Sequence, residues 1–188
     1  MKDALKLMRI PFSVYLMPVF WFALSTQPGF APMRAVAVFL ILHLLVYPAS
    51  NGYNSYFDRD EGSIGGLQHP PRVSKRLFWL VVAFDCLAVL AAAWLEPAFA
   101  ACILVYLMVS KAYSYDKIRL KKYPFGSTLV VVIFQGAFTY LMVQVGLAIA
   151  PRAMLQTENL VFAGVSSLFL CGSYPLTQIY QHTEDAQR

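Results

Sequence analysis

The sequence predicts an all-α fold, a polytopic bundle of transmembrane helices, and three observations lead to this prediction. Hydrophobic residues make up 59% of the 188 residues and charged residues only 13%, whereas soluble domains average about 25% charged residues. The mean hydropathy is +0.56. Apolar stretches long enough to cross a bilayer recur along the chain. We therefore expect an integral membrane protein with a single domain over residues 1–188.

Six apolar stretches have the length of a membrane-spanning helix, which is about 17 to 25 residues. They lie at about residues 11–26, 35–50, 77–95, 98–114, 125–149 and 159–179. Pro, Gly and charged residues separate them in segments such as QPGFAP, LEPAF and IAPRAMLQTEN, and these residue types end helices. The first stretch is not a cleaved signal peptide, because no small-residue cleavage site follows it and further spans do.

The distribution of basic residues predicts how the spans are oriented. All Lys and Arg residues except Arg34 and Arg152 fall in the N-terminal segment, the 51–76 loop, the segment KAYSYDKIRLKK or the C-terminal tail. Cytoplasmic loops carry the excess of basic residues, so we expect both termini in the cytoplasm, at the inner (cell) membrane of a bacterium. The net charge of +5 is thus explained by topology and calls for no nucleic-acid partner.

The second span ends in a polar segment, NGYNSYFDRDEGSIGG. If the helix continues past Ser50, four oxygen-bearing side chains fall on one of its faces and Asp60 points elsewhere. These four are Asn51, Asn54, Asp58 and Glu61. Such oxygens suit Mg²⁺, which binds through one or two carboxylates plus substrate phosphates. A solvated loop is the alternative interpretation, because Asn, Asp, Gly and Ser are also common in loops.

The loop after the fourth span is basic and lies on the same predicted side as the polar segment. Its basic residues are Lys111, Lys117, Arg119, Lys121 and Lys122. Beside metal ligands, Lys and Arg would neutralise the charge that develops on a departing diphosphate. Any cytoplasmic loop also collects basic residues to hold topology or to contact anionic lipid, so this loop alone decides nothing.

Four sequence patterns occur in a fixed order along the chain. NSYFDRDEG, residues 54–62, follows the second span and is itself followed by the basic, proline-containing IGGLQHPPRVSKR. A Y-x-x-x-K element runs from Tyr113 to Lys117, and SYPLTQIYQHTEDAQR ends the sixth span. In this combination the whole chain resembles the UbiA family of intramembrane prenyltransferases, whose first aspartate-rich motif is N-D-x-x-D-x-x-x-D.

The chain departs from the motifs of that family at three positions. Ser55 and Gly62 replace the first and last Asp of the first motif. Only Asp58 stays in register. Gln181 stands where the second motif usually has a carboxylate, so metal binding there would rest on Asp185. The number of bound metal ions is therefore left open.

The resemblance implies a Mg²⁺-dependent transfer of an isoprenoid group from a prenyl diphosphate to an aromatic or other lipophilic acceptor within the membrane, such as a quinone precursor. The implied metal ligands are Asn54, Asp58 and Asp185, together with Glu61, which the shared helical face suggests in place of the missing carboxylate. The implied catalytic residues are Asp58, Tyr113 and Lys117, and the implied diphosphate-binding residues are Asn51, Arg72, Lys117 and Arg119.

The resemblance also implies nine helices around a central cavity, and this chain has room for six. We expect a truncated sequence or an additional chain that supplies the missing helices, and a catalytically inactive truncated homologue is one alternative. A small membrane transporter or channel is another, although it would be expected to carry acids or broken helices at the bilayer midplane. The D-G-x-x-A-R signature of lipid phosphatidyltransferases is absent. Asp85, inside the third span, has no assigned role.

Overall fold

The structure is a computed structural model that describes residues 1–27, 29–59 and 61–178. Within these ranges it contains helices and no strands, so the all-α prediction is confirmed. Its elements are α1 (Lys2–Leu7), η1 (Ile10–Leu16), α2 (Met17–Ser25), α3 (Pro32–Leu40), η2 (Ile41–Val46), α4 (Tyr47–Asp58), α5 (Lys75–Leu95), α6 (Pro97–Ser114), η3 (Leu120–Lys122), α7 (Pro124–Val131), η4 (Val132–Phe138), α8 (Thr139–Gly146), α9 (Pro151–Met154) and α10 (Thr157–Gln178).

Several of these elements join into long apolar helices. Among the described residues, five helices are long and apolar enough to cross a membrane. They are Lys2–Ser25, Pro32–Asp58, Lys75–Leu95, Pro97–Ser114 and Phe125–Gly146. The sixth predicted span, 159–179, coincides with α10, which is a helix but is not one of these five. Five of the six predicted spans therefore match a candidate membrane helix.

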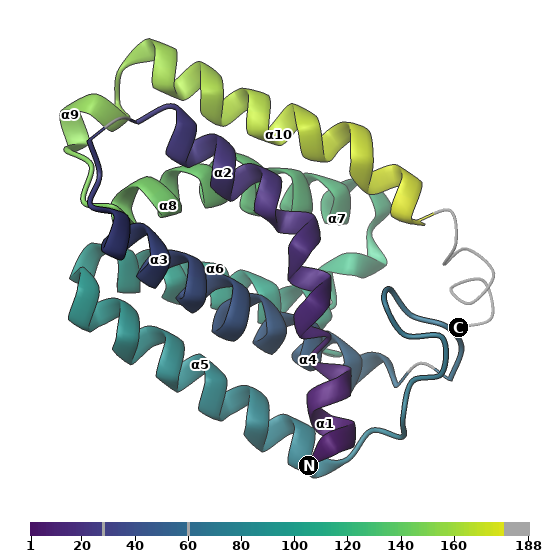
Figure 1. Cartoon of the computed structure of the whole chain (residues 1–188). Coiled ribbons are helices and arrows are strands. Elements are labelled where there is room, and N and C mark those ends of the chain that lie inside the picture. The colour runs from purple at the N-terminus through teal and green to yellow at the C-terminus, as the bar shows by residue number, and fades with distance from the viewer. Residues whose placement is uncertain (28, 60, 179–188) are drawn as a thin grey trace.

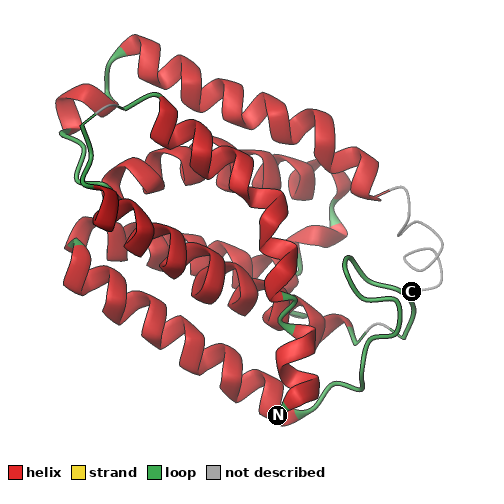
Figure 2. Cartoon of the chain, in the orientation of Figure 1, coloured by secondary structure: helices red, strands yellow, loops and turns green. Residues whose placement is uncertain are grey.

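The helices run side by side, and the connecting loops gather at the two ends of the bundle (Figures 1 and 2). The N-terminus and the 61–74 loop lie at one end (Figure 1). The α2–α3 and α5–α6 connections and α9 lie at the other end (Figure 1). Two of the segments that were predicted to be cytoplasmic thus lie at the same end of the described bundle.

This arrangement allows a direct test of orientation. A reporter fused after Lys122 is expected to be cytoplasmic, and one fused near Arg152 is expected to be external, because the basic loops lie at the Lys122 end. Paired fusions to alkaline phosphatase and to a fluorescent protein would measure this. Fluorescence without phosphatase activity at Arg152 would contradict the predicted topology.

Arg34, at the opposite end from the basic loops, has a structural explanation. Its Nε donates to the carbonyl oxygen of Gly146 at 2.7 Å, and its Nη2 donates to that of Leu95 at 3.0 Å. The same Nη2 pairs with Glu96 at 3.2 Å. These carbonyls lie at the C-terminal ends of α8 and α5, where a cation is favoured by the helix dipole. Arg34 therefore holds three helix ends together.

α10 packs very closely against η4, a π-helical segment in the fifth membrane helix. The Ser167 hydroxyl donates to the Val132 carbonyl at 3.0 Å and accepts from the Ala137 N–H at 3.0 Å. A Cβ atom on Gly136 would lie 2.5 Å from the Cα of Ser167. The widened helix frees backbone groups, and a side chain of α10 satisfies them. Gly136 is required here because no side chain fits between the two helices.

The end of α4 is fixed by tight packing against α1 and α5. A Cβ on Gly52 would lie 2.9 Å from Cγ2 of Val81, so α4 and α5 are in close contact there. Leu7, Ala49 and Leu77 are buried in the same small core. Since a close-packed core resists displacement, the polar residues at the end of α4 are held in defined positions.

Candidate active site at the end of α4

The candidate site begins with two oxygen-bearing side chains on the last turns of α4. Asn54 and Asp58 lie four residues apart, so they share one face of the helix. The Asp58 side chain is only 10% exposed. α4 ends at Asp58, because the next residue, Arg59, has a left-handed backbone conformation with φ of 51°. The two side chains therefore form the polar end of a membrane-spanning helix.

Two cations from the segment after α6 contact this pair. Lys121 Nζ pairs with Oδ1 of Asp58, and Nη2 of Arg119 lies 4.0 Å from the same oxygen. Lys121 Nζ also donates to Oδ1 of Asn54 at 3.4 Å. The Ser114 hydroxyl donates to that Asn54 oxygen at 2.7 Å. Residues that are about 60 positions apart in sequence thus form one cluster of oxygen acceptors and cations.

A turn of the backbone brings these cations to Asp58. Arg119 has a left-handed conformation with φ of 41°, directly before the short helix η3. This turn directs Lys121 toward α4, where its side chain is only 18% exposed, whereas Lys117 and Lys122 are exposed. The sequence analysis selected Lys117 and Arg119 from this loop but not Lys121, because Lys121 belongs to none of the motifs.

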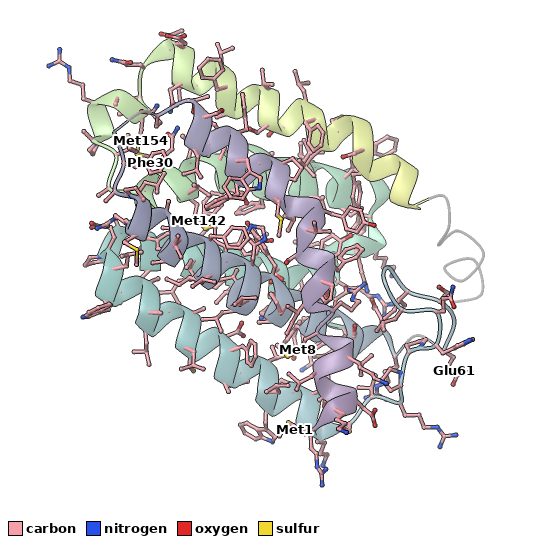
Figure 3. The ribbon with its side chains drawn as sticks, viewed as in Figure 1. Met1, Met8, Phe30, Glu61, Met142 and Met154 are labelled. Carbon is pink, nitrogen blue, oxygen red and sulfur yellow. The ribbon has the colours of Figure 1, made fainter. Side chains whose placement is uncertain are left out.

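Glu61 does not share the helical face of Asn54 and Asp58. The helix ends at Asp58, and the left-handed Arg59 changes the direction of the chain, so Glu61 lies exposed in the following loop. Figure 3 shows Glu61 at the outer edge of the molecule. The argument from a shared face was therefore wrong for Glu61. Its assignment as a metal ligand stays a prediction.

The other predicted site residues occupy different positions. Asn51 is half-buried on α4, and Arg72 is exposed in the loop before α5. Neither Arg72 nor Lys117 is among the ion-pair partners of Asp58 in the described part of the chain. Gln181 and Asp185 lie outside the described residues. The structure thus brings together Asn54, Asp58 and Arg119 from the predicted set.

The donor set can be compared with the needs of a metal ion. Among the described residues, no group of three or more His, Cys, Asp or Glu side chains lies close enough to hold a metal. One carboxylate and one amide oxygen do not form a complete protein cage. They do fit Mg²⁺, which keeps several waters and completes its coordination with substrate phosphates.

A comparison with protein families identifies the family of the chain. The model of the UbiA prenyltransferase family matches residues 15–188. The chain belongs to this family. No curated protein and no solved structure matches the chain. Membership implies membrane prenyltransferase activity, with prenyl diphosphate and lipophilic molecules as substrates.

Ser55, which stands at an Asp position of the UbiA motif, faces away from the cluster. Its side chain is buried, and its hydroxyl donates to the carbonyl oxygen of Leu7 at 3.3 Å. A carboxylate here would meet a backbone oxygen in the contact between α1 and α4. Ser55 therefore has a packing role in this member of the UbiA family.

Tyr113, of the Y-x-x-x-K element, lies where α6 meets α10. Its hydroxyl is hydrogen-bonded to that of Tyr174 at 2.8 Å. Ser114, the next residue, contacts Asn54. The last turn of α6 therefore links the cluster on α4 to the last described turns of α10, the helix that leads to the second UbiA motif.

Proposed function

We propose that this chain transfers an isoprenoid group from a prenyl diphosphate to an aromatic or other lipophilic acceptor within the membrane, in a Mg²⁺-dependent reaction. One observation carries the proposal, namely the pairing of Asn54 and Asp58 with Lys121 and Arg119 in a member of the UbiA family. Metal-binding oxygens and cations within contact of one another are what binding of a diphosphate and its metal ion requires.

The residues of the cluster have separate tasks in this proposal. Asn54 and Asp58 would hold Mg²⁺, with Glu61 and Asp185 as further predicted ligands. The chemistry that Mg²⁺ supplies at such a site is polarisation of the phosphate oxygens. Lys121 pairs with Asp58, so the buried carboxylate has a cation as its partner.

The cations would take the departing charge. When the bond between the prenyl carbon and the diphosphate oxygen breaks, its electron pair leaves with the diphosphate. Lys121 and Arg119 would turn toward the phosphate oxygens and stabilise this charge. Lys117, Arg72 and Asn51 remain proposed contacts of the diphosphate.

The organic part of the reaction takes place on the apolar side of the cluster. The allylic cation is attacked by an electron-rich ring carbon of the acceptor, which then loses its proton. Tyr113 is proposed to lie beside the prenyl group, where an aromatic ring stabilises positive charge. Since the cluster lies at the end of membrane-spanning helices, both lipophilic substrates can reach it from the bilayer. A precursor of a quinone is the proposed acceptor class.

Two neighbouring lysines test the proposal. Lys121→Met is expected to lower kcat/KM for the prenyl diphosphate by about tenfold or more, which corresponds to about 1.4 kcal/mol of lost stabilisation. Lys122→Met, an exposed matched control, should change it by less than about twofold. Initial rates with a labelled prenyl diphosphate, measured with purified protein in phosphatidylglycerol vesicles, give both values.

The same assay tests the metal requirement. Removal of divalent ions with EDTA should abolish transfer, and added Mg²⁺ should restore it. Transfer that persists in EDTA would contradict the Mg²⁺ dependence.

For the lysine variants, equal losses of kcat/KM in Lys121→Met and Lys122→Met would contradict the assignment of Lys121.

A further inference from the structure

A groove of about 700 Å³ lies between α5 and α6, and neither Asp58 nor the residues that contact it line this groove. This volume is within the range of small-molecule sites, about 300–1,000 Å³. Its walls come from α5, α6, the end of α4 and the segment after α6. Both helices are candidate membrane spans, and Leu90 and Met108 in the walls are 68% and 62% exposed. The groove therefore opens toward lipid.

An ion pair lies in this groove. Nζ of Lys111 is 2.9 Å from Oδ2 of Asp85 and 3.1 Å from its Oδ1, and it lies 4.8 Å from the centre of the Tyr53 ring. The two charged side chains are 23% and 19% exposed, so both can be reached from the groove. Ionisable residues within a membrane are costly and usually functional.

Apolar side chains also hold α5 against α6. The two helices are consecutive and joined at Glu96, and they already bury an apolar contact surface that includes Ala88, Ala92, Phe99 and Ile103. Apolar side chains would hold the two helices together without the desolvation free energy that a partly buried ion pair costs. The accessible pair therefore offers charged contacts to a ligand in the groove.

The groove has a polar, aromatic end and an apolar end. Tyr53 and Tyr115 line the end that contains the ion pair. Val89, Leu90 and Leu104 line the part nearer to the α5–α6 connection at Glu96. A molecule with an oxygen-bearing ring at one end and an apolar chain at the other matches this gradient, because the tyrosine rings can pack against a ring.

The charged residues of the groove favour a ligand whose polar end is uncharged. Asp85 and Lys111 cancel each other, so the groove offers no net positive charge to a phosphate. It offers one donor, the ammonium, beside one acceptor, the carboxylate, which match a phenol hydroxyl or a quinone oxygen. We infer that the groove binds a neutral phenol or quinone with a single apolar chain, at a site separate from the diphosphate site and independent of prenyl transfer.

A photoreactive probe tests this inference. The probe is para-decylphenol with a diazirine in its chain, added to the full chain in phosphatidylcholine vesicles, and labelled peptides are identified by mass spectrometry. We expect saturable labelling of α5 and α6. Unlabelled para-decylphenol should compete about tenfold more strongly than decylbenzene, which lacks the hydroxyl.

Variants identify the groove and its polar end. Met108→Trp fills the groove and should remove the saturable labelling. Leu168→Trp, a change at a similarly exposed position on α10, should leave it intact. The double change Asp85→Asn with Lys111→Met leaves no unpaired charge, and it should abolish the preference for the phenol over decylbenzene while some labelling persists. Circular dichroism and gel filtration confirm that each variant is folded.

Three outcomes would overturn the inference. Equal competition by decylbenzene would indicate an ordinary lipid-facing surface. Unchanged saturable labelling in Met108→Trp would place the probe elsewhere. Stronger competition by phosphatidylglycerol than by para-decylphenol would indicate a site for a phospholipid head group.

Discussion

Asp58→Asn is expected to reduce prenyl transfer by about tenfold or more, since loss of one metal-binding carboxylate removes at least about 1.4 kcal/mol of transition-state stabilisation. The substitution keeps the size of the side chain and an oxygen for Lys121, so membrane insertion should be unaffected. Turnover of a labelled prenyl diphosphate measures the loss, and the Mg²⁺ concentration for half-maximal activity should rise in any residual activity.

The matched control is Asp3→Asn, the same chemical change on the exposed first turn of α1. Its turnover should stay within about twofold of the unmodified chain. Retention of more than about a tenth of the activity in Asp58→Asn would be incompatible with a ligand role for this carboxylate.

The second large effect is expected on stability, at the contact between η4 and α10. Gly136→Ala places a Cβ 2.5 Å from the Cα of Ser167, so the two helices must separate. Overpacking of this kind costs about 1–3 kcal/mol, and a contact this close to a backbone atom is expected in the upper part of that range, above the gain of about 1 kcal/mol that Ala provides over Gly in a helix. We expect a lower Tm, measured by circular dichroism in detergent.

Gly164→Ala is the control for this prediction, because no atom other than those of the adjoining residues and backbone of α10 lies within 4 Å of the position that its Cβ would take. It lies on α10 and should leave the Tm unchanged or raise it. A Tm for Gly136→Ala at or above that of Gly164→Ala would contradict the close packing of α10 against η4.

Hydropathy predicted where the membrane helices lie but not where they end. The second span was expected to end near Ser50, yet the helix continues to Asp58. The polar residues 51–58 remain helical because their side chains find partners, Ser114 and Lys121 for Asn54 and two cations for Asp58. An apolarity scale cannot detect such partners, since they come from a distant segment.

The assumption of regular helical spacing explains why the prediction was right for Asn54 and Asp58 and wrong for Glu61. The prediction that Asn54 and Asp58 share a face holds, because both residues belong to α4. The same spacing failed for Glu61, because a left-handed Arg59 ends the helix. Non-glycine residues rarely adopt this conformation, so the sequence contains no signal for it.

Composition, basic-residue distribution and ordered motifs were sufficient to predict the helical membrane class and the UbiA family, because apolar length and residue spacing are properties of the chain itself. Only the tertiary structure selected Lys121 among equivalent lysines, paired Asp85 with Lys111, and placed Ser167 against Gly136. Each of these contacts joins residues at least 26 positions apart. Their partners depend on how separate helices pack, and this is decided by the close fit of the whole bundle.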